Sequence, residues 1–136
     1  MEVIADTTVL IDLWRYRKTP RRLADLTGKV GAAAILVPWI TQAEFSRGAL
    51  FKDVSLATLA EFYASFHLLP LDQATMDAYC RLWVVMARTG RAPDYPDLWI
   101  AACAVAQKVP VLTRNPKHFC EVPGLAVIGY EIASVQ

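Results

Sequence analysis

Three acidic residues stand where the chain changes from an apolar run to the start of a helix: Asp6, Glu44 and Asp97. A fourth such transition, after the apolar run that ends at Thr113, carries Asn115. Mg²⁺ and Mn²⁺ prefer oxygen ligands, keep several waters, and often bind through one or two carboxylates together with substrate phosphates. Three acids on three separate segments of a small chain therefore predict a divalent-cation site and the chemistry of phosphodiester cleavage.

Each of these positions also fits a helix cap or first turn, a role worth roughly 1 kcal/mol. Glu44 has the sharpest alternative, because Thr41-x-x-Glu44 fits a capping box, in which the glutamate bonds back to the backbone of the cap residue. The alternatives for the other positions are Asp6 as an N-cap, Asp94 as the cap of a helix whose dipole Asp97 complements, and Asn115 as a cap before Pro116.

The elements that must position these residues alternate along the chain. Short apolar runs predict strands at 2–5, 33–37, 67–70, 109–113 and 125–128. Helical spacing predicts helices at 7–16, 19–26, 41–50, 56–66, 72–88 and 97–107, with Gly28 and Gly90 ending two of them. Such alternation favours a parallel α/β sheet with helices on both faces, and sites in open parallel sheets form at the carboxyl ends of the strands.

Length and composition narrow the class of protein. The chain has 136 residues, which favours a single domain over 1–136, and 55% of them are hydrophobic, which argues against disorder. A net charge of +1 does not indicate nucleic-acid binding, so any basic surface that binds nucleic acid must be a local patch. The three cysteines lack CxxC spacing, which fits a reducing cytoplasm, and no apolar run approaches the roughly 18 residues of a membrane span. We therefore expect a cytoplasmic protein with no membrane contact.

Four blocks of the sequence resemble the PIN-domain nucleases, and among them the VapC-like toxins of bacterial and archaeal toxin–antitoxin pairs. The blocks are Ile-Ala-Asp-Thr-Thr-Val-Leu-Ile-Asp (4–12), Ile-Thr-Gln-Ala-Glu-Phe-Ser-Arg-Gly (40–48), Asp-Leu-Trp-Ile-Ala-Ala-Cys-Ala (97–104) and Leu-Thr-Arg-Asn-Pro-Lys-His-Phe (112–119). Together they cover essentially the whole chain in the order and spacing of the family. The resemblance implies a three-layer α/β/α fold with a mostly parallel central sheet of four to five strands.

The resemblance also implies roles for individual residues. The acids that hold Mg²⁺ or Mn²⁺ in these nucleases match Asp6, Glu44 and Asp97, and a fourth catalytic position matches Asn115. Many relatives carry a further acid shortly afterwards, where this chain has His118. The departure leaves three carboxylates and argues against a tightly held second metal, since asparagine supplies a neutral oxygen and histidine supplies none.

Further residues of the same segments are candidates for phosphate or RNA contacts. Thr7 and Thr113 have hydroxyls that could bond water or phosphate, or orient the acids, with ordinary strand-end and turn hydroxyls as the alternative. Arg47, Arg114 and Lys117 lie in the same blocks as the acids and are the better candidates for phosphate contacts. Arg47 has the alternative of pairing with the acid three residues before it.

Partner surfaces are less well marked. The basic run 15–22, with Trp14 and Tyr16 interleaved, is either a phosphate- or partner-binding arm or a solvated connection. VapC-like proteins are typically homodimers neutralised by a small protein antitoxin, and an apolar surface around Trp14 and 56–66 is a candidate for those contacts. Asp12 is expected to be structural or exposed, and the tryptophans expected in the core or an interface are Trp39, Trp83 and Trp99.

Four functions compete. The leading hypothesis is a metal-dependent endoribonuclease that acts as a toxin on RNA; the second is a PIN nuclease of RNA processing without a toxin role. The third is a PIN-like RNA-binding or regulatory module with weak or no nuclease activity. The fourth, a phosphotransfer domain, is opposed by Asp6-Thr7-Thr8, which lacks paired aspartates, and by Arg114-Asn115 where a lysine is expected.

Overall fold

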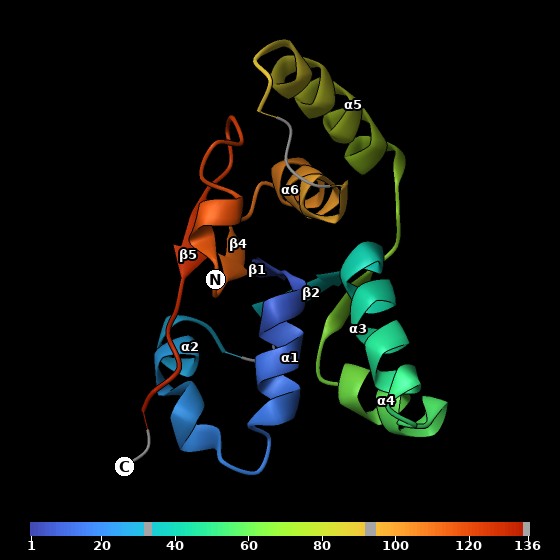
Figure 1. Cartoon of the computed structure of the whole chain (residues 1–136), viewed down its shortest axis with the longest axis vertical. Helices are drawn as coiled ribbons and strands as arrows, with labels where there is room; N and C mark the ends of the chain where they lie inside the picture. The colour runs from blue at the N-terminus through green and yellow to red at the C-terminus, as the bar shows by residue number, and fades with distance from the viewer. Residues whose placement is uncertain (32–33, 92–94, 135–136) are drawn as a thin grey trace.

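Five short strands form one parallel sheet in the computed structural model, which describes residues 1–31, 34–91 and 95–134 (Figure 1). The strand order is β3-β2-β1-β4-β5, so the first strand of the chain lies at the centre. The five predicted strands are confirmed with small shifts of their ends, and one residue of the predicted strand 33–37 lies outside the described residues. The strands are β1 (Val3–Ala5), β2 (Ile35–Pro38), β3 (His67–Leu69), β4 (Val111–Thr113) and β5 (Val127–Gly129).

Helices cover both faces of this sheet, as the alternation predicts (Figure 1). On one face α6 lies between the sheet and α5, and on the other α1, α2, α3 and α4 gather. The helices are α1 (Thr7–Arg15), α2 (Ala24–Lys29), α3 (Trp39–Phe51), α4 (Leu56–Tyr63), α5 (Gln73–Arg88) and α6 (Tyr95–Gln107), with 3-10 turns η1 (Pro20–Leu23) and η3 (Pro116–His118).

Alternate side chains of the central strand build two separate cores. Ile4 packs with α5 and α6, whereas its neighbours Val3 and Ala5 pack with the helices of the other face. The run Leu98–Ala104 of α6 is buried without a break, because the sheet lies on one side of this helix and α5 on the other. The three-layer α/β/α architecture follows from this division of apolar side chains.

Several helix ends differ from the sequence prediction, and local geometry explains them. The helix predicted to start at Thr41 starts at Trp39, because Pro38 is extended and serves as the N-cap. Gly28 lies inside α2, which continues to Lys29 until Val30 takes up an extended conformation. The helix predicted over 56–66 ends at Tyr63, and α6 begins two residues before the predicted 97. The loop that carries Asp94 falls partly outside the described residues.

The three cysteines, Cys80, Cys103 and Cys120, are free thiols. Burial raises the pKa of the Cys103 thiol to about 11, so this thiol stays protonated and packs as a small apolar group. Within the described part of the chain, no helix combines the length and the apolar character needed to cross a bilayer.

Candidate metal centre and active site

Asp6 lies directly after the central strand, at the edge of the sheet where the parallel strands end. It is the N-cap of α1, and its Oδ1 accepts hydrogen bonds from the Val9 amide at 3.3 Å and the Thr8 hydroxyl at 2.5 Å. Its Oδ2 accepts from the Thr113 hydroxyl at 2.6 Å. The capping explanation is therefore correct, but the cap uses only one of the two carboxylate oxygens, and a hydroxyl from β4 holds the other.

Burial makes the charged form of the Asp6 carboxylate unfavourable in this position. The residue is 5% exposed, and burial raises the pKa of its carboxyl, although the hydrogen bonds from Thr113, Thr8 and Val9 act in the opposite direction. No cationic side chain contributes to that balance among the described residues. A buried anion without a positive partner is the condition that a bound cation relieves.

Glu44 is not part of a capping box, and the structure overturns that explanation. α3 begins before Thr41, and the Thr41 hydroxyl instead donates to the backbone oxygen of Ala5 at 3.0 Å. The Glu44 Oε1 accepts from the Thr7 hydroxyl at 2.8 Å. Because Thr7 is the residue that follows Asp6, this bond brings the second acid to the end of the central strand.

Asp97 lies in the first turn of α6, which packs against β1 and α3. Its side chain is 27% exposed, more open than that of Asp6, and its Oδ2 lies 3.6 Å from the Nδ1 of His118. His118 comes from the turn after β4 and is 59% exposed. His118 therefore faces one of the three predicted acids.

The remaining predicted residues differ in where their side chains lie. Asn115 is exposed and makes no side-chain capping bond, while its amide donates to the Thr113 hydroxyl at 3.0 Å. Arg47 and Lys117 are exposed, and Arg47 forms no ion pair with Glu44 in the part of the chain that the structure describes. Both cations thus remain on the surface beside segments that carry the acids.

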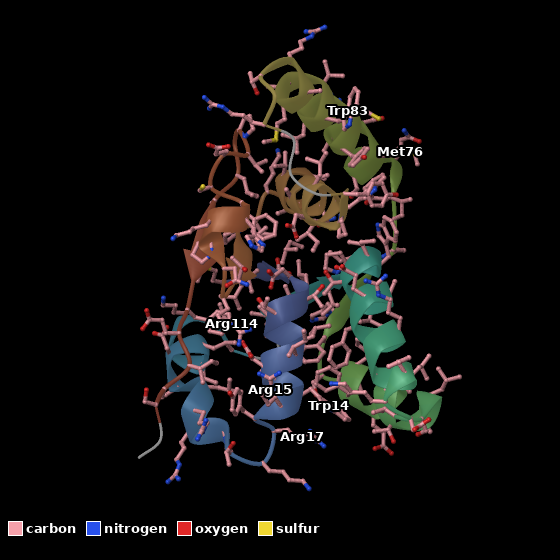
Figure 2. All side chains as sticks on the ribbon, in the orientation of Figure 1. Trp14, Arg15, Arg17, Met76, Trp83 and Arg114 are labelled. Carbon is pink, nitrogen blue, oxygen red and sulfur yellow. The ribbon has the colours of Figure 1, made fainter. Side chains whose placement is uncertain are left out.

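Arg114 was predicted to contact phosphate, but its side chain already has an acidic partner. Its Nη1 lies 2.8 Å from Oδ1 of Asp12, and Figure 2 shows Arg114 reaching from the β4 side toward α1. Asp12 is fully buried, and its Oδ2 accepts from the Tyr130 hydroxyl at 2.6 Å. Burial and then the bond to Asp12 raise the pKa of Tyr130, so the phenol stays neutral and donates.

Sequence reasoning missed the importance of Asp12 and Tyr130. The sequence favours a structural or exposed Asp12, and the side chain is buried and structural. A signal was available, because Asp12 lies three residues after the apolar Val9 on the same buried face of α1, where an unpaired charge would be costly. Nothing in the sequence, however, indicated that its partners would come from residues 102 and 118 positions away.

A groove of about 420 Å³ leads away from the acids between α1 and α3. Thr7 and Glu44 line one part of it, and Trp14 forms part of its apolar wall through edge-to-face contacts with Phe45 and Phe62. The Arg17 guanidinium lies 4.0 Å from the centre of the Trp14 ring, and Figure 2 shows the two side chains together at the far end of α1. The cations that line the groove are Arg15, Arg17 and Lys52.

The three tryptophans expected in the core or an interface differ in burial: Trp99 is buried, Trp39 is partly buried and Trp83 is exposed. Trp39 and Trp99 pack edge to face at 5.4 Å, and Trp99 stacks on Tyr79 at 3.8 Å. Trp83 is half exposed on the outer face of α5 (Figure 2). Its exposure is consistent with an interface role rather than a core role.

The described residues contain no group of three or more His, Cys, Asp and Glu side chains placed closely enough to hold a metal by themselves. The donors that are present, carboxylate oxygens with room for water, nevertheless suit Mg²⁺ or Mn²⁺, since these ions usually keep several waters. The buried, cation-deficient Asp6 supports the same fit.

Comparison with known proteins agrees with this arrangement. The family model of the PIN domain matches residues 3–125. Ribonuclease VapC1 of Methanocaldococcus jannaschii is 29% identical over 118 residues, covering 87% of this chain and 79% of that protein. Ribonuclease VapC5 of Mycobacterium tuberculosis is 34% identical over 95 residues, covering 65% of this chain and 69% of that protein.

The fold is shared with solved structures as well. A chain in the crystal structure of VapBC2 from Rickettsia felis, bound to a DNA fragment from their promoter, superposes with a TM-score of 0.78 at 20% identity. The match covers 96% of this chain and all of that one.

Proposed function

This chain belongs to the PIN domain family, and from that premise we propose that it is a metal-dependent endoribonuclease that acts as the toxin of a toxin–antitoxin pair. Its relatives named as VapC ribonucleases support the activity, and a structural neighbour named as a VapBC pair supports the antitoxin partner. We place it in the cytoplasm, where its three free thiols remain reduced.

The observation that carries the proposal is the shared position of two acids on different elements. Asp6 ends β1, and the Thr7 hydroxyl beside it bonds Glu44 of α3 at 2.8 Å. Asp97 enters from a third element, α6, which contacts both β1 and α3. Helix capping explains Asp6 alone, and it explains neither the bond that joins Thr7 to Glu44 nor the acid that opens α6 beside β1 and α3.

We assign the cation to Asp6, Glu44 and Asp97, with water completing its shell. When bound, Mg²⁺ or Mn²⁺ supplies Lewis-acid polarisation of a phosphate oxygen and lowers the pKa of a bound water. The chain's own work is to hold the carboxylates: the Thr113 and Thr7 hydroxyls each fix one of them by a hydrogen bond. The two threonines thus orient acids, the second of the roles considered for them.

Substrate phosphates need cations that are not already paired. Arg47 and Lys117 are exposed beside Glu44 and His118 respectively, so we assign phosphate contacts to them. Arg114 is a weaker candidate, because Asp12 holds its guanidinium. Contacts of this kind position RNA without reading its sequence.

The groove between α1 and α3 is the surface that we assign to the antitoxin. Its wall is apolar around Trp14 and Phe45, its far end carries Arg17 and Lys52, and its near end reaches Glu44. This combination fits a peptide segment with apolar side chains and acidic residues. A segment bound there would cover an acid of the site, which explains how binding would inhibit cleavage.

For the homodimer, α5 offers the more suitable surface. Met76 and Trp83 lie seven residues apart and expose apolar atoms on one side of this helix with Val84 beside them, and Figure 2 shows Met76 and Trp83 pointing away from the body of the chain. Exposed aromatic side chains amid apolar neighbours are typical of interface centres. Light scattering of Trp83→Lys should then give the mass of a monomer where the unmodified chain gives that of a dimer.

The decisive experiment maps cleavage of total small RNA by the purified chain with Mg²⁺, with Mn²⁺ and with EDTA. Asp97→Asn serves as the matched control, because it changes one charge at constant size. Discrete cuts that need metal and disappear in Asp97→Asn support the nuclease. Cuts that persist in the variant would mean that the site is wrongly assigned.

The other candidate functions are outcomes of the same experiment. Measurable Mn²⁺ binding without any cleavage would favour the PIN-like RNA-binding or regulatory module. Cleavage that is not inhibited by any protein encoded beside this chain would favour an RNA-processing nuclease without a toxin role.

A further inference from the structure

A series of hydrogen bonds connects Tyr130, the residue after β5, to Asp6. The proposed reaction assigns no role to Asp12, which lies within this series. The Tyr130 hydroxyl donates to Asp12 at 2.6 Å, and the Arg114 guanidinium donates to the other oxygen of Asp12 at 2.8 Å. The Arg114 amide donates to the Thr8 hydroxyl at 3.2 Å, which in turn donates to Asp6 at 2.5 Å. The series therefore ties together the ends of β1, β4 and β5 and the helix α1.

We propose that Asp12, Arg114 and Tyr130 are positioning residues, which hold the segment after β4 so that the Asp6 carboxylate keeps one orientation toward the cation and the substrate. We call these three residues the positioning network. The inference rests on the proposed function. It adds three residues that affect activity without being among the acids assigned to the metal.

Asp12 can act as a fixed reference because it belongs to the same helix as the Asp6 cap. Both lie on α1 or at its start, six residues apart, so their relative position is set by the helix itself. The Asp12 side chain is completely buried, and a buried carboxylate must keep its partners. The pairing with Arg114 thus fixes the turn after β4 against the helix that presents Asp6.

The turn after β4 matters because it supplies or fixes both hydroxyls that hold Asp6. Thr113 donates directly to Asp6, and its oxygen accepts the Asn115 amide at 3.0 Å. Thr8 is held by the amide of Arg114. If the Arg114 side chain lost its anchor, a shift of this turn would release both hydroxyls together, and outer-shell partners of this kind typically change metal affinity 10–100-fold.

Tyr130→Phe is the cleanest test, because it removes one hydroxyl from the network and keeps the buried ring. Mn²⁺ titration of the full chain by calorimetry should show a dissociation constant about 10-fold higher than that of the unmodified chain. RNA cleavage should lose kcat by a similar factor and keep its KM, because no phosphate-contacting residue is changed. Arg114→Lys, which keeps the charge but not the fork of nitrogens, should bind Mn²⁺ better than Arg114→Met.

Ser55→Ala is the matched control for a general loss of stability. It also removes one hydroxyl, which caps α4 by accepting from the Thr58 amide at 3.1 Å. Ser55 lies four residues beyond α3, whose 13 residues run away from the site over about 20 Å. This variant should melt earlier than the unmodified chain and bind Mn²⁺ with unchanged affinity.

The outcomes separate this inference from the proposed function. Unchanged Mn²⁺ affinity and kcat in Tyr130→Phe, with only the melting temperature lowered as in Ser55→Ala, would overturn the positioning role. If the unmodified chain binds Mn²⁺ but cleaves no RNA, the nuclease proposal fails while the affinities still decide the role of the network. If the unmodified chain binds no Mn²⁺, both proposals are wrong.

Discussion

The two sides of the candidate site are built differently. On the β1–β4 side, Asp6 is buried and both of its carboxylate oxygens accept hydroxyl hydrogen bonds. On the α6 side, Asp97 is partly open to solvent and faces His118, whose side chain is more exposed still. One acid is held in a preformed polar network, and the other lies where solvent and substrate can reach it.

In this way a small fold can combine a precisely held acid with an accessible one. Fixing Asp6 requires burying its charge, which raises the pKa of its carboxyl and destabilises the fold. The hydrogen bonds from the threonine hydroxyls offset only part of this destabilisation. Keeping the Asp97 side open avoids that cost and leaves room for water and a phosphate group. Under the proposed function, we assign the geometry to the buried side and the binding of substrate to the open side.

The largest effects should come from the acids themselves. Asp6→Asn and Asp97→Asn should each reduce RNA cleavage at least about 100-fold, since the charge stabilisation that a bound cation provides is worth several kcal/mol. Single-turnover cleavage with saturating enzyme measures the loss. If either variant retained more than a tenth of the activity, that acid would not belong to the site.

Asp6→Asn should also change the stability of the fold, which tests the buried side of the site directly. The raised pKa of Asp6 means that this residue favours folding below its ordinary pKa of 3.8 and that this contribution is lost as the pH rises through its folded-state value. Because asparagine does not ionise, Asp6→Asn should be more stable than the unmodified chain in EDTA at pH 7, with the advantage shrinking toward pH 4.

Urea unfolding between pH 4 and pH 7 measures this trend. The unmodified chain is the reference at each pH. A stability advantage of Asp6→Asn that does not grow between pH 4 and pH 7 would contradict a raised pKa of Asp6.

The Asp12–Arg114 pair should give the largest loss of stability. Arg114→Met leaves the fully buried Asp12 carboxylate without its cation; because the Arg114 side chain is itself 35% exposed, the loss should lie between the roughly 1 kcal/mol of a surface pair and the roughly 3 kcal/mol of a fully buried one. The double variant Asp12→Asn with Arg114→Met should recover part of this loss, because no charge is then left unpaired. Chemical denaturation measures both, and a loss below about 1 kcal/mol, typical of a surface pair, would contradict the assigned burial.

His118→Asp should strengthen cation binding on the open side of the site. A carboxylate in place of the imidazole beside Asp97 adds an oxygen donor and a negative charge, so Mg²⁺ should bind about 10-fold more tightly. Calorimetric titration measures the change, with His118→Asn as the control that adds a neutral oxygen only. Weaker binding in His118→Asp would mean that carboxylate repulsion outweighs the added ligand.

The smallest effect is expected for Asn115→Asp. Asn115 is exposed, so an added charge there is screened by water and salt, and Mg²⁺ affinity should rise only about two- to threefold. The same titration measures it at low and at physiological salt. An effect larger than that of His118→Asp would place Asn115, rather than His118, beside the cation.

Much of the fold was predictable because its elements depend on local patterns. Apolar runs located all five strands, and the helix predicted over 72–88 begins at Gln73 with Asp72 as its N-cap. Helix ends were less predictable, because they depend on where the chain must turn. Helix α3 starts before Thr41 because Pro38 is its N-cap, and α2 continues past Gly28 to Lys29.

The acids of the site were also visible in the sequence, but their partners were not. Asp6, Glu44 and Asp97 could be singled out because each follows or opens an element at one edge of a parallel sheet. Only the structure shows that Glu44 accepts from the Thr7 hydroxyl and is not part of a capping box. Arg114 illustrates the limit, since a basic residue beside a site suggests phosphate binding until a buried acid is found next to it.

The sequence by itself determined the order of strands and helices, the family and the candidate acids, because these follow from periodicity and from short motifs. Tertiary structure decided which side chains are buried and which charges are paired. The ion pair of Asp12 with Arg114 and the bond of Thr113 to Asp6 join residues more than 100 positions apart. Such contacts exist only after the parallel strands have been brought side by side, and no local pattern in the chain encodes them.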